Sequence, residues 1–179
     1  MNRTRILVEV AILVAMAFVL ELGFSFLPAM PQGGRIGVSM LPLIVIAWRH
    51  GIGFGIIGGV VYGLLNLMLD GVLYHWASFF LDYTIAFGVI GFSGIAKKLF
   101  GDKVYVFGLA ILLAFVFRFI SHTVSGVLLF GEYAPAGQNV WIYSMGYQLT
   151  YLLPAFVITL LVGLGVYFPL KSLDADLEF

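Results

Sequence analysis

Four ionisable side chains interrupt stretches of the sequence that are otherwise apolar: Glu21, Asp82, Arg118 and His122. Within a membrane-spanning helix, such a group costs roughly 2.5–3.5 kcal/mol at the bilayer centre, so each one needs a reason. Arg118 and His122 are four residues apart and therefore share one face of a helix. The carboxylate of Asp82 suits a cationic or amino-bearing small molecule. We hypothesise that either Glu21 or Asp82 neutralises Arg118.

Aromatic rings accompany these groups. Tyr83 directly follows the acidic residue, and Tyr143, Tyr147 and Tyr151 recur at helical spacing near the end of the chain. Trp141 precedes this stripe and lies at the predicted outer boundary of its helix. Aromatic faces attract flat or quaternary cations with roughly 0.5–2 kcal/mol per contact, which favours the same class of ligand.

The depth of these groups in the membrane can be calculated from the helical rise of 1.5 Å per residue. This calculation places Asp82 about 9 Å, Gln148 about 12 Å and His122 about 12–15 Å below the outer surface of the membrane. Arg118 lies one helical turn deeper. Three predicted helices thus bring polar groups to a common depth, which indicates a small-molecule pocket in the outer half of the membrane. The alternative is a buried polar network that only fixes helix packing.

Six apolar helices must position these residues. A helix needs about 20 apolar residues to cross the hydrocarbon core. The sequence offers apolar runs at 6–27, 36–48, 52–69, 76–96, 105–130 and 140–168. The second run is short, so its helix is tilted or begins within the preceding loop. We expect an all-α integral membrane bundle of six transmembrane helices, forming one substrate-binding domain over residues 1–179.

The composition agrees with lipid as the main solvent of this chain. It is 62% hydrophobic and 10% charged, with a mean hydropathy of +1.09, whereas soluble domains carry about 25% charged residues. The net charge is zero and there is no basic run, which argues against nucleic acid as a partner. The sequence has no G-x-x-x-x-G-K-[ST] loop, metal-ligand cluster or nucleophile motif, so we expect neither an enzyme nor a metal protein.

Lysine and arginine are unequally divided between the two ends of the predicted helices. One end carries seven: Arg3, Arg5, Arg49, Lys97, Lys98, Lys103 and Lys171. The other end carries only Arg35. Cytoplasmic loops are enriched in these residues, so both termini are predicted to be cytoplasmic in a multi-pass protein of the plasma membrane.

Small residues recur one helical turn apart in two of the runs. Glycines stand at every fourth position from 51 to 63, which allows another backbone to approach closely. We interpret this face as internal helix packing, with a subunit interface as the alternative. Ala11 and Ala15 have the same spacing in the first run, where an external partner helix is the stronger possibility.

Several short segments form one ordered set along the chain. They are PQGG at 31–34, SMLP at 39–42, LDYTIAF at 81–87, RFISHTVSG at 118–126, FGEYAP at 130–135, WIYSMGYQ at 141–148 and YLLP at 151–154. Together they resemble the thiamine-specific S component, the substrate-binding subunit, of energy-coupling factor (ECF) transporters. The resemblance covers nearly the whole chain.

This resemblance implies a six-helix subunit that binds thiamine near the outer surface and has no cofactor of its own. It implies association with an ECF transmembrane coupling subunit, docked at Ala11 and Ala15, and with two ABC-type ATPases that use ATP. The loop between the first two helices would act as a lid. Carried over by position, the ligand contacts are Asp82, Tyr83, Arg118, His122, Tyr143, Gln148 and Tyr74, to which we add Trp141 at the mouth.

Three other interpretations stay open at this point. The chain could be an S component for another vitamin, an independent channel or facilitator, or a purely structural membrane protein. Some members of the family carry Glu, Lys and Asn where this chain has Asp82, Arg118 and Gln148, so the reach of these side chains differs here.

Overall fold

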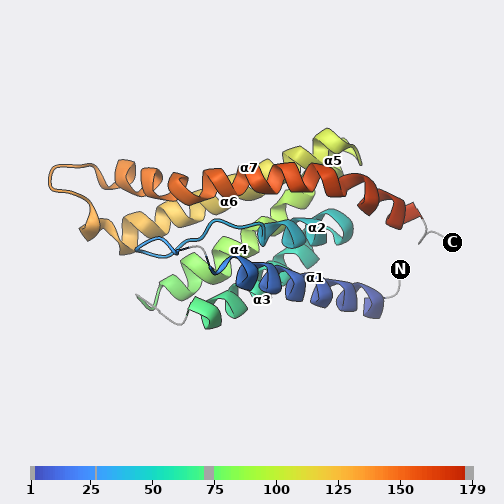
Figure 1. Ribbon diagram of the computed structural model, residues 1–179, viewed down its shortest axis with the longest axis horizontal. Helices are drawn as coiled ribbons and strands as arrows, with labels where there is room; N and C mark the ends of the chain where they lie inside the picture. Colours follow the sequence, from blue (N-terminus) through green and yellow to red (C-terminus); the bar gives the residue numbers. More distant parts are fainter. Residues whose placement is uncertain (1–2, 27, 71–74, 176–179) are drawn as a thin grey trace.

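The described part of the chain comprises residues 3–26, 28–70 and 75–175 of a computed structural model. Most of its helices run along the long axis of the molecule (Figure 1). They are α1 (Arg3–Phe24), α2 (Met40–His50), α3 (Ile52–Asp70), η1 (Phe79–Ile85), α4 (Ala86–Gly88), η2 (Val89–Gly94), α5 (Ile95–Phe100), α6 (Val104–Leu129), η3 (Gly131–Tyr133) and α7 (Val140–Ala175). The segments from η1 to α5 follow one another without a break, and we call this run, Phe79–Phe100, helix four.

The predicted membrane bundle is confirmed, with one short member. Within the described residues, five helices are long and apolar enough to cross a membrane: Arg3–Phe24, Ile52–Leu69, Phe79–Phe100, Val104–Leu129 and Val140–Ser172. The sixth, α2, has 11 residues. At 1.5 Å per residue it extends about 16 Å, roughly half of the 30 Å hydrocarbon core.

Several helix boundaries differ from the prediction: α1 spans Arg3–Phe24 rather than 6–27, and helix four begins at Phe79 rather than at 76. α2 begins at Met40 rather than at 36, and the loop before it lines a cavity. Helix four continues past residue 96 and ends before Gly101, whose positive φ of 81° stops the helix. α7 continues through Pro169, where proline removes only one backbone hydrogen bond and membrane helices tolerate the loss.

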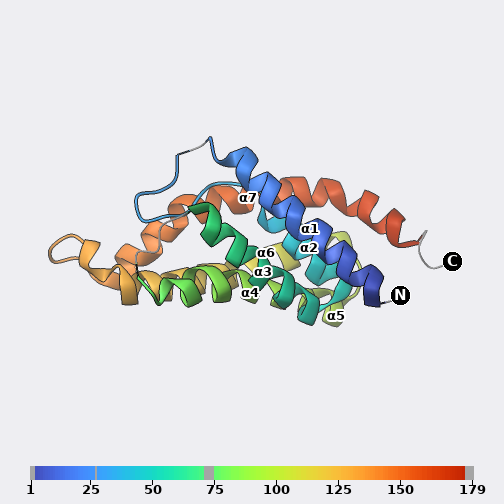
Figure 2. The ribbon, with the colours of Figure 1, turned by 90° about the horizontal axis from the view of Figure 1, so that it is seen from below.

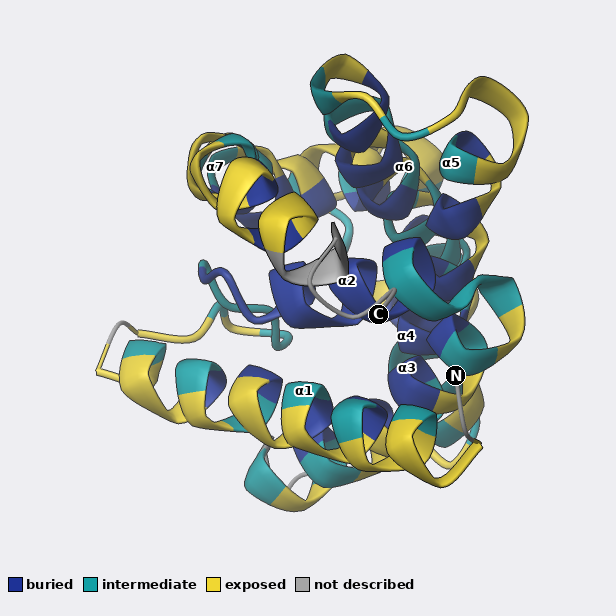
Figure 3. Ribbon diagram, turned by 90° about the vertical axis from the view of Figure 1, so that its right-hand side faces the viewer, coloured by how far each residue is buried: buried dark blue, intermediate teal, exposed yellow. Residues whose placement is uncertain are grey.

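The short helix α2 lies in the middle of the bundle (Figure 3). All of its residues from Met40 to Trp48 are buried, and it contacts α1, α3, helix four, α6 and α7. Its side chains therefore pack against protein on every side. In this respect α2 resembles a core helix of a large soluble protein more than a membrane span.

Glycines hold α3 directly against the backbone of helix four. A Cβ atom on Gly59 would lie 2.2 Å from the carbonyl oxygen of Phe87. One on Gly63 would lie 2.3 Å from the carbonyl oxygen of Tyr83. Real Cβ atoms do not approach other atoms so closely, so these positions require glycine. The interpretation of the glycine face as internal packing is confirmed.

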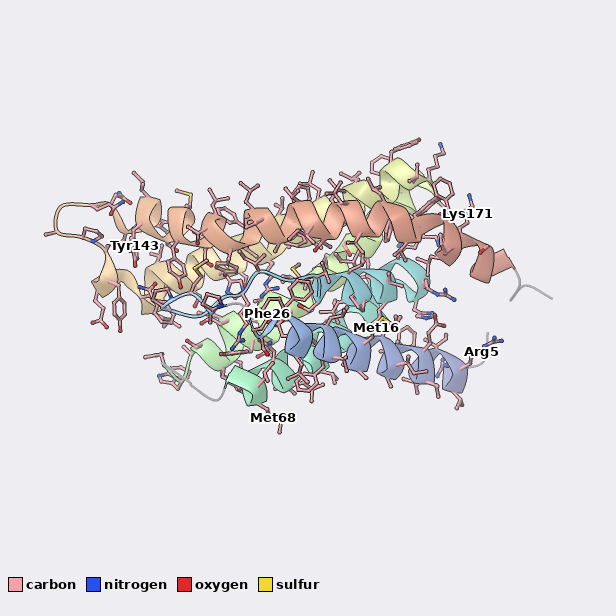
Figure 4. The ribbon with its side chains drawn as sticks, viewed as in Figure 1. Arg5, Met16, Phe26, Met68, Tyr143 and Lys171 are labelled. Atoms are coloured by element: carbon pink, nitrogen blue, oxygen red, sulfur yellow. The ribbon has the colours of Figure 1, made fainter. Side chains whose placement is uncertain are left out.

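The start of α1 and the end of α7 lie at the same end of the bundle (Figure 1). Arg5 and Lys171 lie at that end, whereas Tyr143 lies toward the opposite one (Figure 4). The excess of lysine and arginine predicts that the end with the termini is cytoplasmic. We therefore call it the inner end and the opposite one the outer end.

Ion pairs join helices at the inner end. The Glu9 carboxylate of α1 lies 2.7 Å from Nε of Arg49 and 3.2 Å from Nε2 of His50. The side chains of both partners are almost fully buried, at 7% and 2% exposed. The contact fixes the inner half of α1 to the end of α2.

A second polar cluster joins α5, α7 and the loop before α6. Asp102 accepts a hydrogen bond from the Tyr167 hydroxyl at 2.8 Å and lies 3.0 Å from Nζ of Lys97. Burial opposes ionisation of Asp102, but the bonds from Lys97 and Tyr167 outweigh it. They hold the pKa of this carboxyl below its usual value.

The glycine contact makes a prediction for stability. Gly63→Ala should force α3 and helix four apart and lower the free energy of unfolding by about 2 kcal/mol or more, as overpacking does. The measurement is the thermal unfolding midpoint of the protein in detergent. Gly53→Ala is the matched control, because a Cβ at Gly53 of the same helix meets nothing within 4 Å. Equal midpoints for the two variants would contradict the tight contact.

Candidate functional site

A cavity of about 180 Å³ lies in the outer half of the bundle. Its lining comes from α1, α2, α3, helix four, α6, α7 and the loop at 28–37. On the same measure a water molecule needs about 10–15 Å³, so the space suits a small organic molecule rather than a single ion. Its walls mix carboxylate, guanidinium, imidazole, hydroxyl and aromatic groups, as the sequence predicted for the outer half.

Helix four presents its acidic residue from a π-helical turn. The segment η1, Phe79–Ile85, is wider than an α-helix and carries both Asp82 and Tyr83. The Ser121 hydroxyl of α6 donates to the carbonyl of Leu81 at 3.0 Å, satisfying one of its backbone groups. Short π-helical turns occur frequently at functional sites, because they redirect side chains that a regular helix would place elsewhere.

A chain of hydrogen bonds connects three of the four ionisable residues that the sequence places within the membrane. Nε of Arg118 donates to Nε2 of His122 at 3.1 Å, and Nδ1 of His122 lies 3.2 Å from Oδ1 of Asp82. Arginine has no acceptor, so Nε2 must carry a lone pair. The proton of the ring is then on Nδ1, where it is donated to Asp82. His122 is therefore neutral and joins a cation on one side to an anion on the other.

The partner of Arg118 differs from our hypothesis. The guanidinium lies over the Phe87 ring, 4.3 Å from its centroid, and its hydrogen bond goes to His122. Among the described residues, neither Glu21 nor Asp82 forms an ion pair with it. The reason is geometric: the His122 ring occupies the space between Arg118 and Asp82, so the two charges compensate each other through imidazole.

Polar contacts between α6 and α7 form another wall. Nε2 of Gln148 donates to the carbonyl of His122 at 3.2 Å, and the Ser144 hydroxyl donates to that of Thr123 at 2.9 Å. Tyr151 donates to Oε1 of Gln148, and its ring meets the His122 ring edge to face. These contacts hold the side chains of Gln148 and His122 in fixed orientations at the wall of the cavity.

The loop at 28–37 runs toward the outer part of α7 (Figure 2), and its residues line the cavity together with those of α7. The backbone N–H of Gln32 donates to the Tyr147 hydroxyl at 2.9 Å, and its side-chain amide donates to the Tyr143 hydroxyl at 2.7 Å. Tyr147 in turn donates to the carbonyl of Gly33 at 2.9 Å. Gly34 has a positive φ of 93°, and a Cβ there would lie 2.7 Å from the Tyr151 ring. The loop is therefore bonded to α7 where both line the cavity.

Most of the predicted site residues meet at this cavity. Its lining includes six of the eight, namely Asp82, Tyr83, Arg118, His122, Tyr143 and Gln148. Trp141 is 51% exposed at the start of α7 and is not part of the lining. Tyr74 lies outside the described residues. The ligand contacts themselves stay predictions.

Sequence reasoning gave no cavity role to several residues that line it. Glu21 was considered only as a partner of Arg118, Ser39 only as part of the SMLP segment, and Asn66 and Ser78 were not considered. All four are buried. A signal was available for Asn66, because an amide within an apolar helix needs a polar partner or a polar cavity. Ser39 and Ser78 precede their helices, and nothing in the sequence directs them inward.

The fold and the cavity together define a class of protein. A bundle of membrane helices holds a polar cavity at its outer end, closed by a loop and large enough for a small organic molecule. These are the features of a membrane protein that captures a solute. Comparison with known proteins narrows this class to a family.

The model of the thiamine transporter protein family matches residues 7–173. The chain therefore belongs to this family, whose role is transport rather than catalysis. It is 33% identical over 166 residues to the thiamine transporter ThiT of Bacillus subtilis, covering 87% of this chain and 86% of the relative. It is 30% identical over 155 residues to ThiT of Lacticaseibacillus paracasei, covering 78% and 75%. The protein is thus a multi-pass protein of the plasma membrane.

A solved structure has the same fold. The structure of ThiT from Listeria monocytogenes superposes with a TM-score of 0.77, at 25% sequence identity, over 96% of each chain. The arrangement of helices described above is therefore shared with a thiamine transporter over nearly its whole length.

The neutral state of His122 makes a spectroscopic prediction. In protein labelled with ¹⁵N-histidine, the His122 ring should show a protonated Nδ1 and an unprotonated Nε2. The chain has three histidines, so His122→Gln identifies the signals by their loss. An imidazolium pattern, or protonation on Nε2 alone, would contradict the bond from Arg118.

Proposed function

We propose that this chain is the thiamine-binding S component of an ECF-type vitamin uptake transporter. One observation carries the proposal: a member of the thiamine transporter family holds Asp82, His122 and Arg118 in one hydrogen-bonded chain at the wall of its outer cavity. Family membership supports the ligand, and the cavity supports capture from outside. The alternatives are an S component for another vitamin and an independent facilitator.

The chemistry of thiamine matches the groups around the cavity. Thiamine has a thiazolium cation and an aminopyrimidine, so it needs a carboxylate, aromatic faces and hydrogen-bonding partners. We propose Asp82 and Gln148 as polar contacts and Tyr83, His122 and Tyr143 as ring contacts. Arg118 acts on the ligand through the imidazole that it orients. Tyr74 and Trp141 are proposed as contacts at the mouth.

Binding alone does not move a solute against a gradient, so energy must come from partner proteins. We propose that the partners are an ECF transmembrane coupling subunit and two ABC-type ATPases. ATP would be used by the ATPases, and this chain would need no cofactor. The outward face of α1 supports a docking role, because Ala11 and Ala15 are exposed there between large apolar side chains such as Ile12 and Met16.

The proposed ligand gives a direct test. Isothermal titration of the purified protein with thiamine should show saturable binding at one site. Asp82→Asn should weaken it by about 10-fold to 100-fold, as expected for hydrogen bonds to a charged group. Asp102→Asn is the matched control, because Asp102 lies in the polar cluster at the inner end. A folded wild-type protein that binds riboflavin or another vitamin instead of thiamine would contradict the proposal.

The proposed docking face gives a second test. Ala11→Trp and Ala15→Trp should abolish thiamine uptake by vesicles that contain the coupling subunit and ATPases, because a large side chain prevents close helix approach. Thiamine binding to the isolated variants should be unchanged. Leu161→Trp, at a residue that is 68% exposed on α7, is the control and should transport normally. Uptake by wild-type protein in vesicles without partners would favour a facilitator.

A further inference from the structure

The cavity contains a second carboxylate, that of Glu21, whose surroundings differ from those of Asp82. Glu21 is only 7% exposed and continues the inward stripe of α1 formed by Val10, Val14 and Ala17. Its Oε2 atom accepts one hydrogen bond, from the buried Tyr62 hydroxyl, at the long distance of 3.3 Å. The carboxylate therefore lies at the wall of the cavity with one weak, uncharged partner.

The charges of the two carboxylates are compensated differently. Asp82 is linked through the neutral His122 ring to the guanidinium of Arg118. Glu21 forms no ion pair within residues 3–26, 28–70 and 75–175. Arg35 also lines the cavity, from the loop that forms its outer wall. The Glu21 charge is thus the one that a cation entering the cavity can compensate directly.

We propose that Glu21 is the counter-ion for the cationic ring of the ligand, while Asp82 binds uncharged hydrogen-bond donors of the same molecule. The inference rests on the proposed function, because it assumes that the cavity takes a ligand with one charged and one uncharged ring. A buried carboxylate gains much from a cation at close range, since little solvent screens the attraction. Asp82, already held by His122, gains less.

If Glu21 binds the cationic ring, α1 contacts the ligand on one face and the proposed partner subunit on the other. Its inward face would contact the charged ring through Glu21, and its outward face carries Ala11 and Ala15. The charge of the ligand would therefore act on the same helix that presents the proposed docking surface. The other proposed contacts within the cavity come from helix four, α6 and α7.

Two ligands of the same shape separate the roles of the carboxylates. They are thiamine and an uncharged analogue in which a thiophene ring replaces the thiazolium ring. We define charge selectivity as the ratio of the dissociation constant of the analogue to that of thiamine, measured by isothermal titration. Glu21→Gln should raise the dissociation constant of thiamine by at least 10-fold and that of the analogue by less than 3-fold. Charge selectivity therefore falls. Asp82→Asn should weaken both ligands to a similar degree.

Two further variants complete the test. Tyr62→Phe removes the hydrogen bond from Glu21 and should raise charge selectivity by about 3-fold, because the bare carboxylate then depends more on the cation. It also tests the proposal if Glu21→Gln fails to fold. Glu132→Gln, the same change at an exposed residue outside the cavity, should leave both constants unaltered.

The outcomes distinguish this inference from the proposed function. Loss of selectivity in Glu21→Gln, or its rise in Tyr62→Phe, supports the inference. Unchanged selectivity in both variants, or its loss in Asp82→Asn alone, overturns the inference while thiamine binding stands. A wild-type protein that binds neither ligand overturns the proposed function and the inference together.

Discussion

Gly59 and Gly63 place α3 so close to helix four that the carbonyl oxygens of Phe87 and Tyr83 lie where side chains would otherwise be. This contact fixes the depth and rotation of the π-helical turn that carries Asp82. Asp82 positions the His122 ring through a hydrogen bond, and that ring positions Arg118 through another. The polar wall of the cavity thus depends on a contact between two backbones. In lipid, where apolar side chains gain little by leaving the solvent, such close packing is the main source of affinity between helices.

The charged groups of the cavity compensate each other within the membrane. A separated cation and anion would each require their own solvation, which lipid cannot provide. Here a neutral imidazole stands between Arg118 and Asp82, so the two charges compensate each other without touching. The Tyr143 and Tyr147 hydroxyls then hold the loop at 28–37 over the cavity through uncharged bonds. Such uncharged hydrogen bonds are weaker than charge-assisted ones, so the loop is held less firmly than the chain from Arg118 to Asp82.

Most of the fold could be predicted because lipid makes the signal strong. Runs of apolar residues, the glycine spacing and the division of lysine and arginine each report directly on a membrane bundle. The π-helical turn could not be predicted, since it depends on how helix four packs against α3 and α6. The continuation of α7 through Pro169 is likewise set by its surroundings.

The site could be predicted in part for a similar reason. Helical rise gave Asp82, His122 and Gln148 a common depth, and the structure brings them to one cavity. Rise alone does not give the rotation of each helix about its axis. That rotation decides that His122 reaches Asp82, that Glu21 lines the cavity and that Trp141 does not.

The central position of α2 has a consequence for how the protein is made. Its residues emerge from the ribosome before most of the helices that will surround them, since α3, helix four, α6 and α7 all follow it in the chain. An 11-residue segment is too short to enter the bilayer as an independent span. Its contacts with helix four, α6 and α7 can form only after those helices have been inserted. The burial of α2 is therefore completed by residues that are synthesised after it, and until then part of its apolar surface lacks its final partners.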